Sequence, residues 1–313
     1  MSETGGSDIV FVYGALRSGT TLFRLMLDSH PDIDNPGEVD FLFDYLDPDT
    51  THPSGWSYDR ERLVADRTFR QTGLALPDST DGLDLLSAMI AALVRSGKNV
   101  ATLNVHRHAT KIAKVLPESR FIHILRDPRD VARSAVAMGW AGNSYFSCRG
   151  WRDTEEAWDR AAVPEERVIT VRFEDLMSDL ETQLTRVCDF LGVPFDASML
   201  GYHLNSTYDP PDPKVAQQWR RKSTQREVGL IEVEIGPLMA TRGYIPEHPR
   251  PAPGRIEHGV LWTEHRLKRW LFNMRRFGFA LFFGHHMARL LGLNSLEKRL
   301  RAQQDEIIIR NRK

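Results

Sequence analysis

One stretch decides the fold, and it reads Ile9-Val-Phe-Val-Tyr-Gly14-Ala-Leu-Arg17-Ser-Gly19-Thr20-Thr21-Leu-Phe-Arg-Leu-Met-Leu27. It predicts a strand, a glycine loop and a helix without a break. Gly14 and Gly19 have the spacing of the phosphate-binding pattern G-x-x-x-x-G-K-[ST], in which backbone N–H groups and a helix N-terminus hold an anion. Thr20 stands where that pattern has lysine, so the sequence disfavours ATP or GTP hydrolysis.

A cation within the loop replaces this lysine. Arg17 precedes Ser18, Gly19, Thr20 and Thr21, so the loop offers one guanidinium, several hydroxyl groups and backbone N–H groups. We expect this set to bind a compact terminal anion that is transferred without a metal ion.

A second anion-binding motif lies downstream. Residues 120–125 have the apolar character of a buried strand, and a helix is predicted over 128–138. Arg126 follows the strand, and Ser134 lies eight residues further on, about two helical turns up. The two side chains can bind one phosphate if the ligand lies along this helix.

Together these motifs resemble the PAPS-dependent sulfotransferases, whose donor is 3′-phosphoadenosine 5′-phosphosulfate. The resemblance covers roughly residues 8–225 and is closest to the bacterial and tyrosylprotein branches, where arginine replaces the loop lysine. It implies that residues 17–21 bind the 5′-phosphosulfate and that Arg126 and Ser134 bind the 3′-phosphate. It also implies that Arg220 and Arg221 close over the 3′-phosphate.

The resemblance offers two candidates for the general base. In the tyrosylprotein branch a Gly-Glu pair after the first helix supplies the base, which maps onto Glu38; Asp40 takes this role if the register differs. In the cytosolic branch the base is a histidine ahead of the 3′-phosphate strand, which maps onto His106 or His108.

One element of the family is missing. Many relatives carry Lys-Thr-Pro before this region, whereas the corresponding stretch here is Val100-Ala101-Thr102-Leu103-Asn104. Lys98 or Arg107 is a candidate to replace the lysine, and the alternative is that Arg17 acts alone. No cysteine or carboxylate pair lies at ligand spacing near the histidines, so no metal is expected.

Alternation of strands and helices predicts an α/β, P-loop-like three-layer fold with a central, mostly parallel sheet flanked by helices. The expected elements are strands at 9–13, 120–125 and 167–172, helices at 20–29, 81–95, 108–116, 128–138, 151–162 and 178–191, and a long loop after Pro36. We expect a sulfotransferase domain over 1–249 and a basic amphipathic helical extension over 250–313.

Composition fits an ordinary globular protein of 313 residues with 41% hydrophobic content and a net charge of −1. Two cysteines imply no disulfide framework, and the polar first residues do not resemble a signal peptide, so a cytoplasmic location is expected. Residues 250–313 are basic, with 14 Lys and Arg against 5 Asp and Glu.

Aromatic residues and arginines are concentrated in residues 262–293. The uncharged run between Arg276 and Arg289 has twelve residues, whereas a bilayer span needs about 20. We therefore expect this segment to contact the inner membrane surface peripherally and to present the enzyme to a lipid or glycolipid acceptor. The alternative is packing on its own core or on a second subunit in a homodimer.

The predicted reaction is in-line transfer of the sulfuryl group from PAPS to a hydroxyl or amine, with release of adenosine 3′,5′-bisphosphate. A small molecule, lipid or glycan is the expected acceptor, and no nucleic acid partner is expected. Two alternatives keep the same fold: a nucleotide kinase-like phosphotransferase, and a non-catalytic protein that binds a nucleotide or a membrane.

Overall fold

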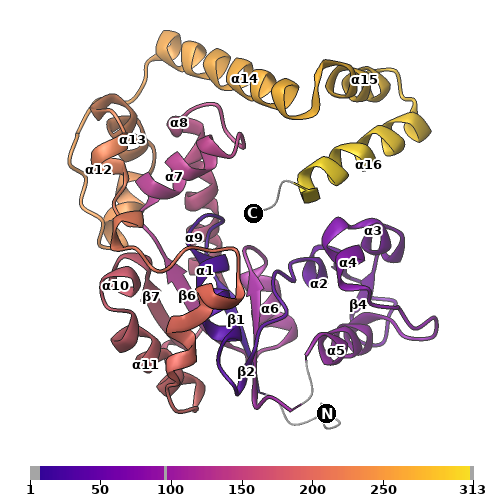
Figure 1. Cartoon of the computed structure of the whole chain (residues 1–313). Coiled ribbons are helices and arrows are strands. Elements are labelled where there is room, and N and C mark those ends of the chain that lie inside the picture. Colours follow the sequence, from indigo (N-terminus) through magenta and orange to yellow (C-terminus); the bar gives the residue numbers. More distant parts are fainter. Residues whose placement is uncertain (1–7, 95–96, 311–313) are drawn as a thin grey trace. The chain divides into compact units, whose positions relative to one another are not determined.

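The computed structural model describes residues 8–94 and 97–310, which form two compact units. The first unit contains the residues up to Asp127 together with Gly150–Gln218, and the second contains Pro128–Arg149 and the residues from Trp219 onward. Figure 1 shows the order of the helices and strands along the chain. The predicted absence of a leader at the N-terminus concerns residues outside the described part.

A parallel sheet of five strands forms the centre of the first unit (Figure 1). In sheet order the strands are β2 Ile33–Asp34, β5 Val100–Val105, β1 Asp8–Tyr13, β6 Arg120–Leu125 and β7 Val168–Arg172. The carboxyl ends of parallel strands meet at one edge of a sheet, which is where ligands bind in such folds. The predicted mostly parallel α/β sheet is confirmed, and both anion motifs begin at this edge.

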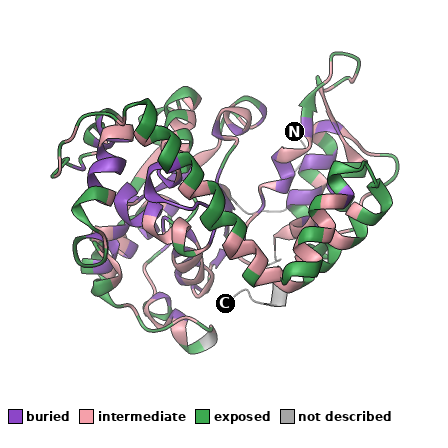
Figure 2. Ribbon diagram, turned by 90° about the horizontal axis from the view of Figure 1, so that it is seen from above, coloured by how far each residue is buried: buried purple, intermediate pink, exposed green. Residues whose placement is uncertain are grey.

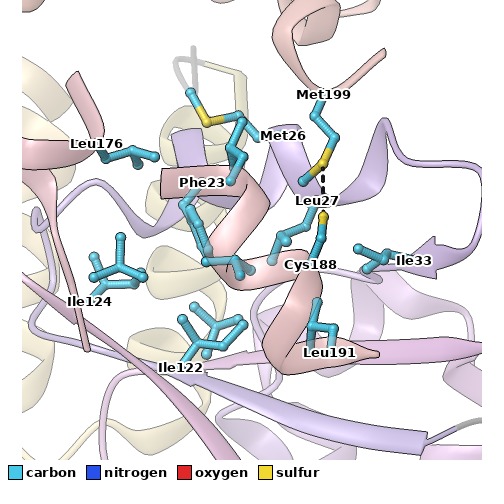
Figure 3. Close-up of a cluster of buried hydrophobic side chains, with 14 of the residues drawn as sticks. Phe23, Met26, Leu27, Ile33, Ile122, Ile124, Leu176, Cys188, Leu191 and Met199 are labelled. Carbon is cyan, nitrogen blue, oxygen red and sulfur yellow. Dashed lines mark hydrogen bonds between the residues drawn. The ribbon is translucent and has the colours of Figure 1, made fainter. Parts of the chain in front are cut away.

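The two faces of the sheet carry separate hydrophobic clusters. Val10 and Val12 of β1 face one side, where Figure 3 shows Phe23 and Leu27 beside Ile122. Phe11 faces the other side. The helices of the first face are α1 Thr20–Asp28, α10 Phe173–Ser178 and α11 Leu180–Leu191, and those of the second are α5 Gly82–Leu93, α6 Ala109–Val115 and α9 Arg149–Ala161. Figure 2 shows buried residues along the strands and exposed ones on the outer helix surfaces.

One expectation about secondary structure was wrong, and one central strand was not predicted. The long loop after Pro36 contains short elements: α2 Phe41–Asp44, β3 Leu46–Pro48, β4 Trp56–Tyr58, α3 Arg60–Ala65 and α4 Arg67–Thr72. Asp59 and Asp66 cap α3 and α4 by accepting from backbone N–H groups. β5, which the sequence did not predict, lies next to β1 in the sheet. The remaining short helices of this unit are 3-10 turns at Glu165–Arg167, Ala197–Asn205 and Pro213–Val215.

The second unit is helical. Its helices are α7 Pro128–Ala137, α8 Ser144–Ser147, α12 Trp219–Lys222, α13 Gln225–Thr241, α14 Arg255–Phe277, α15 Phe279–Leu290 and α16 Asn294–Arg310. The buried Arg129 guanidinium lies 3.7 Å from the centre of the Trp219 ring and donates to Glu232 at 2.9 Å. The backbone N–H of Trp219 donates to the Asp130 carboxylate at 2.8 Å. These contacts join α7, α12 and α13, and they satisfy the buried charges.

The C-terminal segment is three helices rather than one. Gly278, with φ of 79°, ends α14, and α15 begins directly after it. Leu261 of α14 is buried with Tyr145 and Leu230, and its carbonyl accepts from the Asn143 side chain at 2.8 Å. α14 is therefore packed on the core of its own unit. Across the described residues, none of the helices combines the length and apolarity that a membrane span requires.

Candidate active site

The glycine loop between β1 and α1 needs both of its glycines. A Cβ on Gly14 would lie 2.5 Å from the Ile124 carbonyl oxygen, and one on Gly19 would lie 2.3 Å from the Phe173 ring. Gly19 also has a φ of 92°, and Arg17, with φ of 76°, shares this left-handed region. The loop thus folds tightly against β6 and α10, and its conformation positions the first turn of α1.

This loop presents a set of hydrogen-bond donors to an anion. No side chain caps α1, whose N-cap is Gly19, so the N–H groups of its first turn have no capping acceptor among the described side chains. The Ser18 hydroxyl is buried and has no hydrogen-bond partner within the described ranges. Arg17 is exposed beside it. A phosphosulfate oxygen would satisfy the Ser18 hydroxyl and the helix N-terminus together, so the residues fit the predicted ligand.

Arg126 supports the loop from β6. Its Nη1 donates to the Arg17 carbonyl at 3.1 Å and its Nη2 donates to the Val215 carbonyl at 2.8 Å. The guanidinium also stacks over the Phe173 ring, 4.2 Å from its centre. The residue predicted to bind the 3′-phosphate is therefore close to the loop predicted to bind the 5′-phosphosulfate.

The other residues predicted to bind the 3′-phosphate belong to the second unit. Ser134 is half-buried on α7. Arg220 forms a two-pronged ion pair with Glu247 and stacks on Trp219, whereas Arg221 is exposed. Hydrogen bonding and charge from Arg220 lower the pKa of Glu247. Joint binding of one phosphate by Arg126 and Ser134 stays a prediction.

Thr20, His106 and Asp40 form a connected row beside the loop. The His106 Nε2 lies 3.2 Å from the Thr20 hydroxyl, and its Nδ1 lies 3.3 Å from an Asp40 carboxylate oxygen. The backbone N–H of His106 donates to the other Asp40 oxygen at 2.9 Å. The ring of His106, one candidate base, is thus buried between these two side chains, and its Nδ1 has no aligned hydrogen bond within the described residues.

Glu38 is placed by Asn104, a residue that the sequence analysis did not assign to the site. Asn104 lies in β5, and its backbone pairs with residues 37–39 through hydrogen bonds to Gly37 and Val39. Its side chain donates to the Thr20 carbonyl at 3.2 Å and accepts from Asn35 at 3.0 Å. Half-buried Glu38 therefore pairs with the residue whose side chain contacts the start of α1. Polar residues within the apolar run Val100–Val105 were the available signal.

The two substitutes considered for the missing lysine have other partners. Lys98 precedes β5, at the opposite edge of the sheet from the loop, and its ammonium group donates to the carbonyls of Asp28, His30 and Ile33. Arg107 pairs with Asp44, as does His108 at 2.7 Å. The proposal for Lys98 was wrong for this geometric reason. Arg17 lies within the loop, and the Asn104 side chain contacts the carbonyl of Thr20 at its end.

The comparisons with known proteins agree with this geometry. A model of the sulfotransferase family matches residues 9–197. Protein-tyrosine sulfotransferase 1 of Danio rerio is 24% identical over 83% of this chain and 79% of its own length, and protein-tyrosine sulfotransferase A of Caenorhabditis elegans is 23% identical over 81% and 72%. The solved sulfotransferase domain of the curacin biosynthetic pathway covers 79% of this chain and 99% of its own, with a TM-score of 0.56 and 18% identity.

The chain belongs to the sulfotransferase family. It is an enzyme that transfers a sulfuryl group, which is the class of reaction predicted from the two anion motifs. The P-loop-like fold is confirmed as well, because the curacin-pathway domain and the sulfotransferase domain of the Synechococcus PCC 7002 olefin synthase, with a TM-score of 0.54 at 20% identity, share it.

Proposed function

We propose that the loop and Glu38 divide the chemistry of sulfuryl transfer between them. The sulfur–oxygen bond to the acceptor forms while the bridge from sulfur to the 5′-phosphate breaks, and the leaving group is adenosine 3′,5′-bisphosphate. Arg17, with the hydroxyls of Ser18, Thr20 and Thr21 and the N–H of Gly19, stabilises the negative charge that develops on the bridge oxygen. The observation that carries this proposal is the buried, unpartnered Ser18 hydroxyl beside an uncapped helix, in the part of the chain that the structure describes.

Glu38 is the general base in this proposal. Its backbone is fixed against Asn104, which also contacts the start of α1. The residue is half-buried, and in this proposal its carboxylate accepts the proton of the acceptor hydroxyl as the new bond forms. His106 is less suited, because its two ring nitrogens already face Thr20 and Asp40. Arg126, Ser134, Arg220 and Arg221 are proposed to bind the 3′-phosphate.

Two measurements test the function. Isothermal titration should show binding of adenosine 3′,5′-bisphosphate and much weaker binding of ATP, because the loop lacks the lysine for β and γ phosphates. Transfer of radiolabelled sulfuryl from PAPS to a pooled extract of lipids, glycans and metabolites should then identify the acceptor. Arg17→Ala should lower this turnover by about a hundredfold to a thousandfold. Unchanged turnover, or preference for ATP, would refute the assignment.

We further propose that α14 and α15 dock on an anionic membrane surface. Ile256, Val260, Leu267 and Trp270, the apolar stripe, are all exposed on the side of α14 away from buried Leu261. Phe282 of α15 meets Trp270, and Phe279 and Phe283 continue the exposed apolar surface. Arginines and lysine flank the stripe at positions 255, 266, 268, 269 and 275. Apolar residues between cations match the interface of an anionic bilayer.

Vesicle sedimentation tests this surface. The protein should bind vesicles that contain phosphatidylglycerol and bind pure phosphatidylcholine vesicles less, and Leu267→Asp should abolish the binding. Val64→Asp, a change at an exposed residue of α3 in the first unit, is the matched control and should bind normally. A mass that doubles with concentration, without vesicle binding, would instead assign the stripe to a homodimer.

The free, buried thiols of Cys148 and Cys188 support a cytoplasmic location.

A further inference from the structure

His106 lies between the hydroxyl of Thr20 and the carboxylate of Asp40, an arrangement that a general base does not require. The three residues begin or follow three different elements: Thr20 begins α1, His106 follows β5 and Asp40 precedes α2. The His106 side chain is only 3% exposed and the Asp40 side chain 13%. A buried imidazole held between a carboxylate and a hydroxyl of the anion-binding loop suggests control of that hydroxyl.

The charges around the ring decide where its proton lies. The Asp40 carboxylate lies 3.3 Å from Nδ1 without an aligned hydrogen bond among the described residues, and its negative charge favours a proton on this nitrogen, which leaves Nε2 of the neutral ring as an acceptor. Further out, Asp44 is already paired with Arg107 and His108. Tyr13 of β1 is buried, and its pKa is raised by burial, then by Glu155 and Asp40. The negative charge of Asp44 is thus balanced by Arg107 and His108, so the charge of Asp40 is the one that decides the protonation of the His106 ring.

The Thr20 hydroxyl has one proton to give. When His106 is neutral, its Nε2 accepts that proton, and the hydroxyl turns its lone pairs toward the loop, where they repel an anion. When His106 is doubly protonated, Nε2 donates to the Thr20 oxygen at 3.2 Å, and the hydroxyl proton can be donated to the phosphosulfate. Asp40 compensates the positive charge of the ring.

We infer that His106 is a positioning residue that directs the Thr20 hydroxyl, and that donor binding takes up one proton on its Nε2. This inference rests on the proposed function of the loop. It assigns Asp40 the role of the charge that makes the uptake favourable. It also removes His106 as a base, since the loaded form carries both ring protons and has no lone pair to accept a third.

Calorimetry measures the proton directly. Adenosine 3′,5′-bisphosphate is titrated into the full chain at pH 8, in two buffers with different heats of ionisation. An ordinary histidine and the two phosphates of the ligand have lost their titrating protons at this pH. We expect about one proton to be taken up per ligand bound, and an association constant that falls by about tenfold per pH unit above pH 8.

His106→Gln is the matched variant, because the glutamine amide donates a hydrogen bond near the position of Nε2 without gaining a charge. It should bind the bisphosphate with no proton uptake and with little dependence on pH. Asp40→Asn keeps an acceptor for the His106 backbone N–H but removes the charge, so its uptake at pH 8 should be much reduced. Nitrogen NMR of labelled histidine gives an independent readout, in which Nε2 of His106 gains a proton on ligand binding.

The outcomes separate the inference from the function on which it rests. Binding without proton uptake in the wild type, or the same uptake in His106→Gln, would refute the inference and leave the donor site intact. Failure of the wild type to bind the bisphosphate would refute the proposed function and this inference with it. A His106→Gln variant that does not fold leaves the NMR measurement on the wild type, where an unchanged Nε2 signal would be decisive against proton uptake.

Discussion

The Arg126 guanidinium donates to the carbonyl oxygen of Arg17 across 3.1 Å, so the residue that follows β6 supports the loop that follows β1. Its second contact, to the Val215 carbonyl, joins a third segment to the same cation. Arg126 therefore acts on the loop through its contacts as well as on the predicted 3′-phosphate. Ser134 is instead a half-buried residue of α7, so its predicted role is confined to the 3′-phosphate.

This difference separates the effects of two substitutions. Ser134→Ala should weaken adenosine 3′,5′-bisphosphate by about tenfold and leave adenosine 5′-phosphate unchanged, because the ligand contact predicted for this hydroxyl is to the 3′-phosphate. Arg126→Ala should weaken both ligands, and the bisphosphate more, because the support of the loop is lost too. Titration calorimetry with the two nucleotides measures this. If Ser134→Ala weakens both ligands equally, the 3′-phosphate assignment is wrong.

Gly19→Ala should unfold the loop. The substitution forces an alanine into a φ of 92° and a Cβ within 2.3 Å of the Phe173 ring, which together should cost about 2–4 kcal/mol of unfolding free energy. Gly97→Ala is the control, because Gly97 has nearly the same φ, 93°, with nothing within 4 Å of an added Cβ. It should cost about 1 kcal/mol. Urea unfolding measures both; equal losses would show that the ring contact is unimportant.

Glu38→Gln tests the base. Glutamine keeps the size and the hydrogen bonding of the side chain but cannot accept a proton, so kcat should fall by about a hundredfold or more while bisphosphate binding persists. Asp40→Asn should reduce kcat less at the pH optimum. Steady-state kinetics with the identified acceptor provide the measurement. An active Glu38→Gln with an inactive His106→Gln would move the mechanism to the histidine pattern of the cytosolic branch.

The contacts of Asp44 with Arg107 and His108 should make the free energy of unfolding depend on pH in the acid range. Burial alone would raise the pKa of Asp44, but hydrogen bonds and charge from Arg107 and His108 lower it from 3.8 to about 2. A lowered folded-state pKa gives stability that is present above the unfolded pKa and lost as the pH falls toward 2. Asp44→Asn should therefore lose about 1–2 kcal/mol near neutral pH, allowing for the half-exposed Arg107, and match the wild type near pH 2.

Unfolding from pH 7 to pH 2 measures this difference. Asp47→Asn is the control, because Asp47 is exposed and its ion pair with Lys111 is long, at 3.7 Å. It should change stability by less than about 0.5 kcal/mol at every pH. A constant difference between Asp44→Asn and the wild type down to pH 2 would show that the carboxylate charge is not the source of the stability.

The sequence predicted those elements whose signals are local. β6 has the expected bounds because four of its six residues are large and apolar and only His123 separates them, and the loop follows β1 as its glycines require. β5 was missed because Thr102 and Asn104 interrupt its apolar residues, and their partners, Asn35 and Thr20, come from distant parts of the chain. Such long-range satisfaction of buried polar groups cannot be predicted from a single strand.

In the candidate site, too, residues with a local sequence signal could be predicted, and those that depend on long-range contacts could not. Arg17 and Glu38 could be named from their motifs, since the residues themselves carry the chemical signal. The order of Thr20, His106 and Asp40 could not, because it depends on the pairing of residues 37–39 with Asn104. The short helices after Pro36 were missed because the prolines suggested loops, although the capping aspartates were present.

Each compact unit is assembled from two separate parts of the chain, and this limits how the gene can be divided. A fragment that ends at residue 249 would keep α7 and α8 but lose Leu261, whose carbonyl accepts from Asn143 and whose side chain covers Tyr145. The truncated product would then display an apolar surface and a buried amide without its acceptor. Fusion partners and affinity tags therefore belong at the chain ends, and shuffling of contiguous segments between homologues should yield insoluble protein.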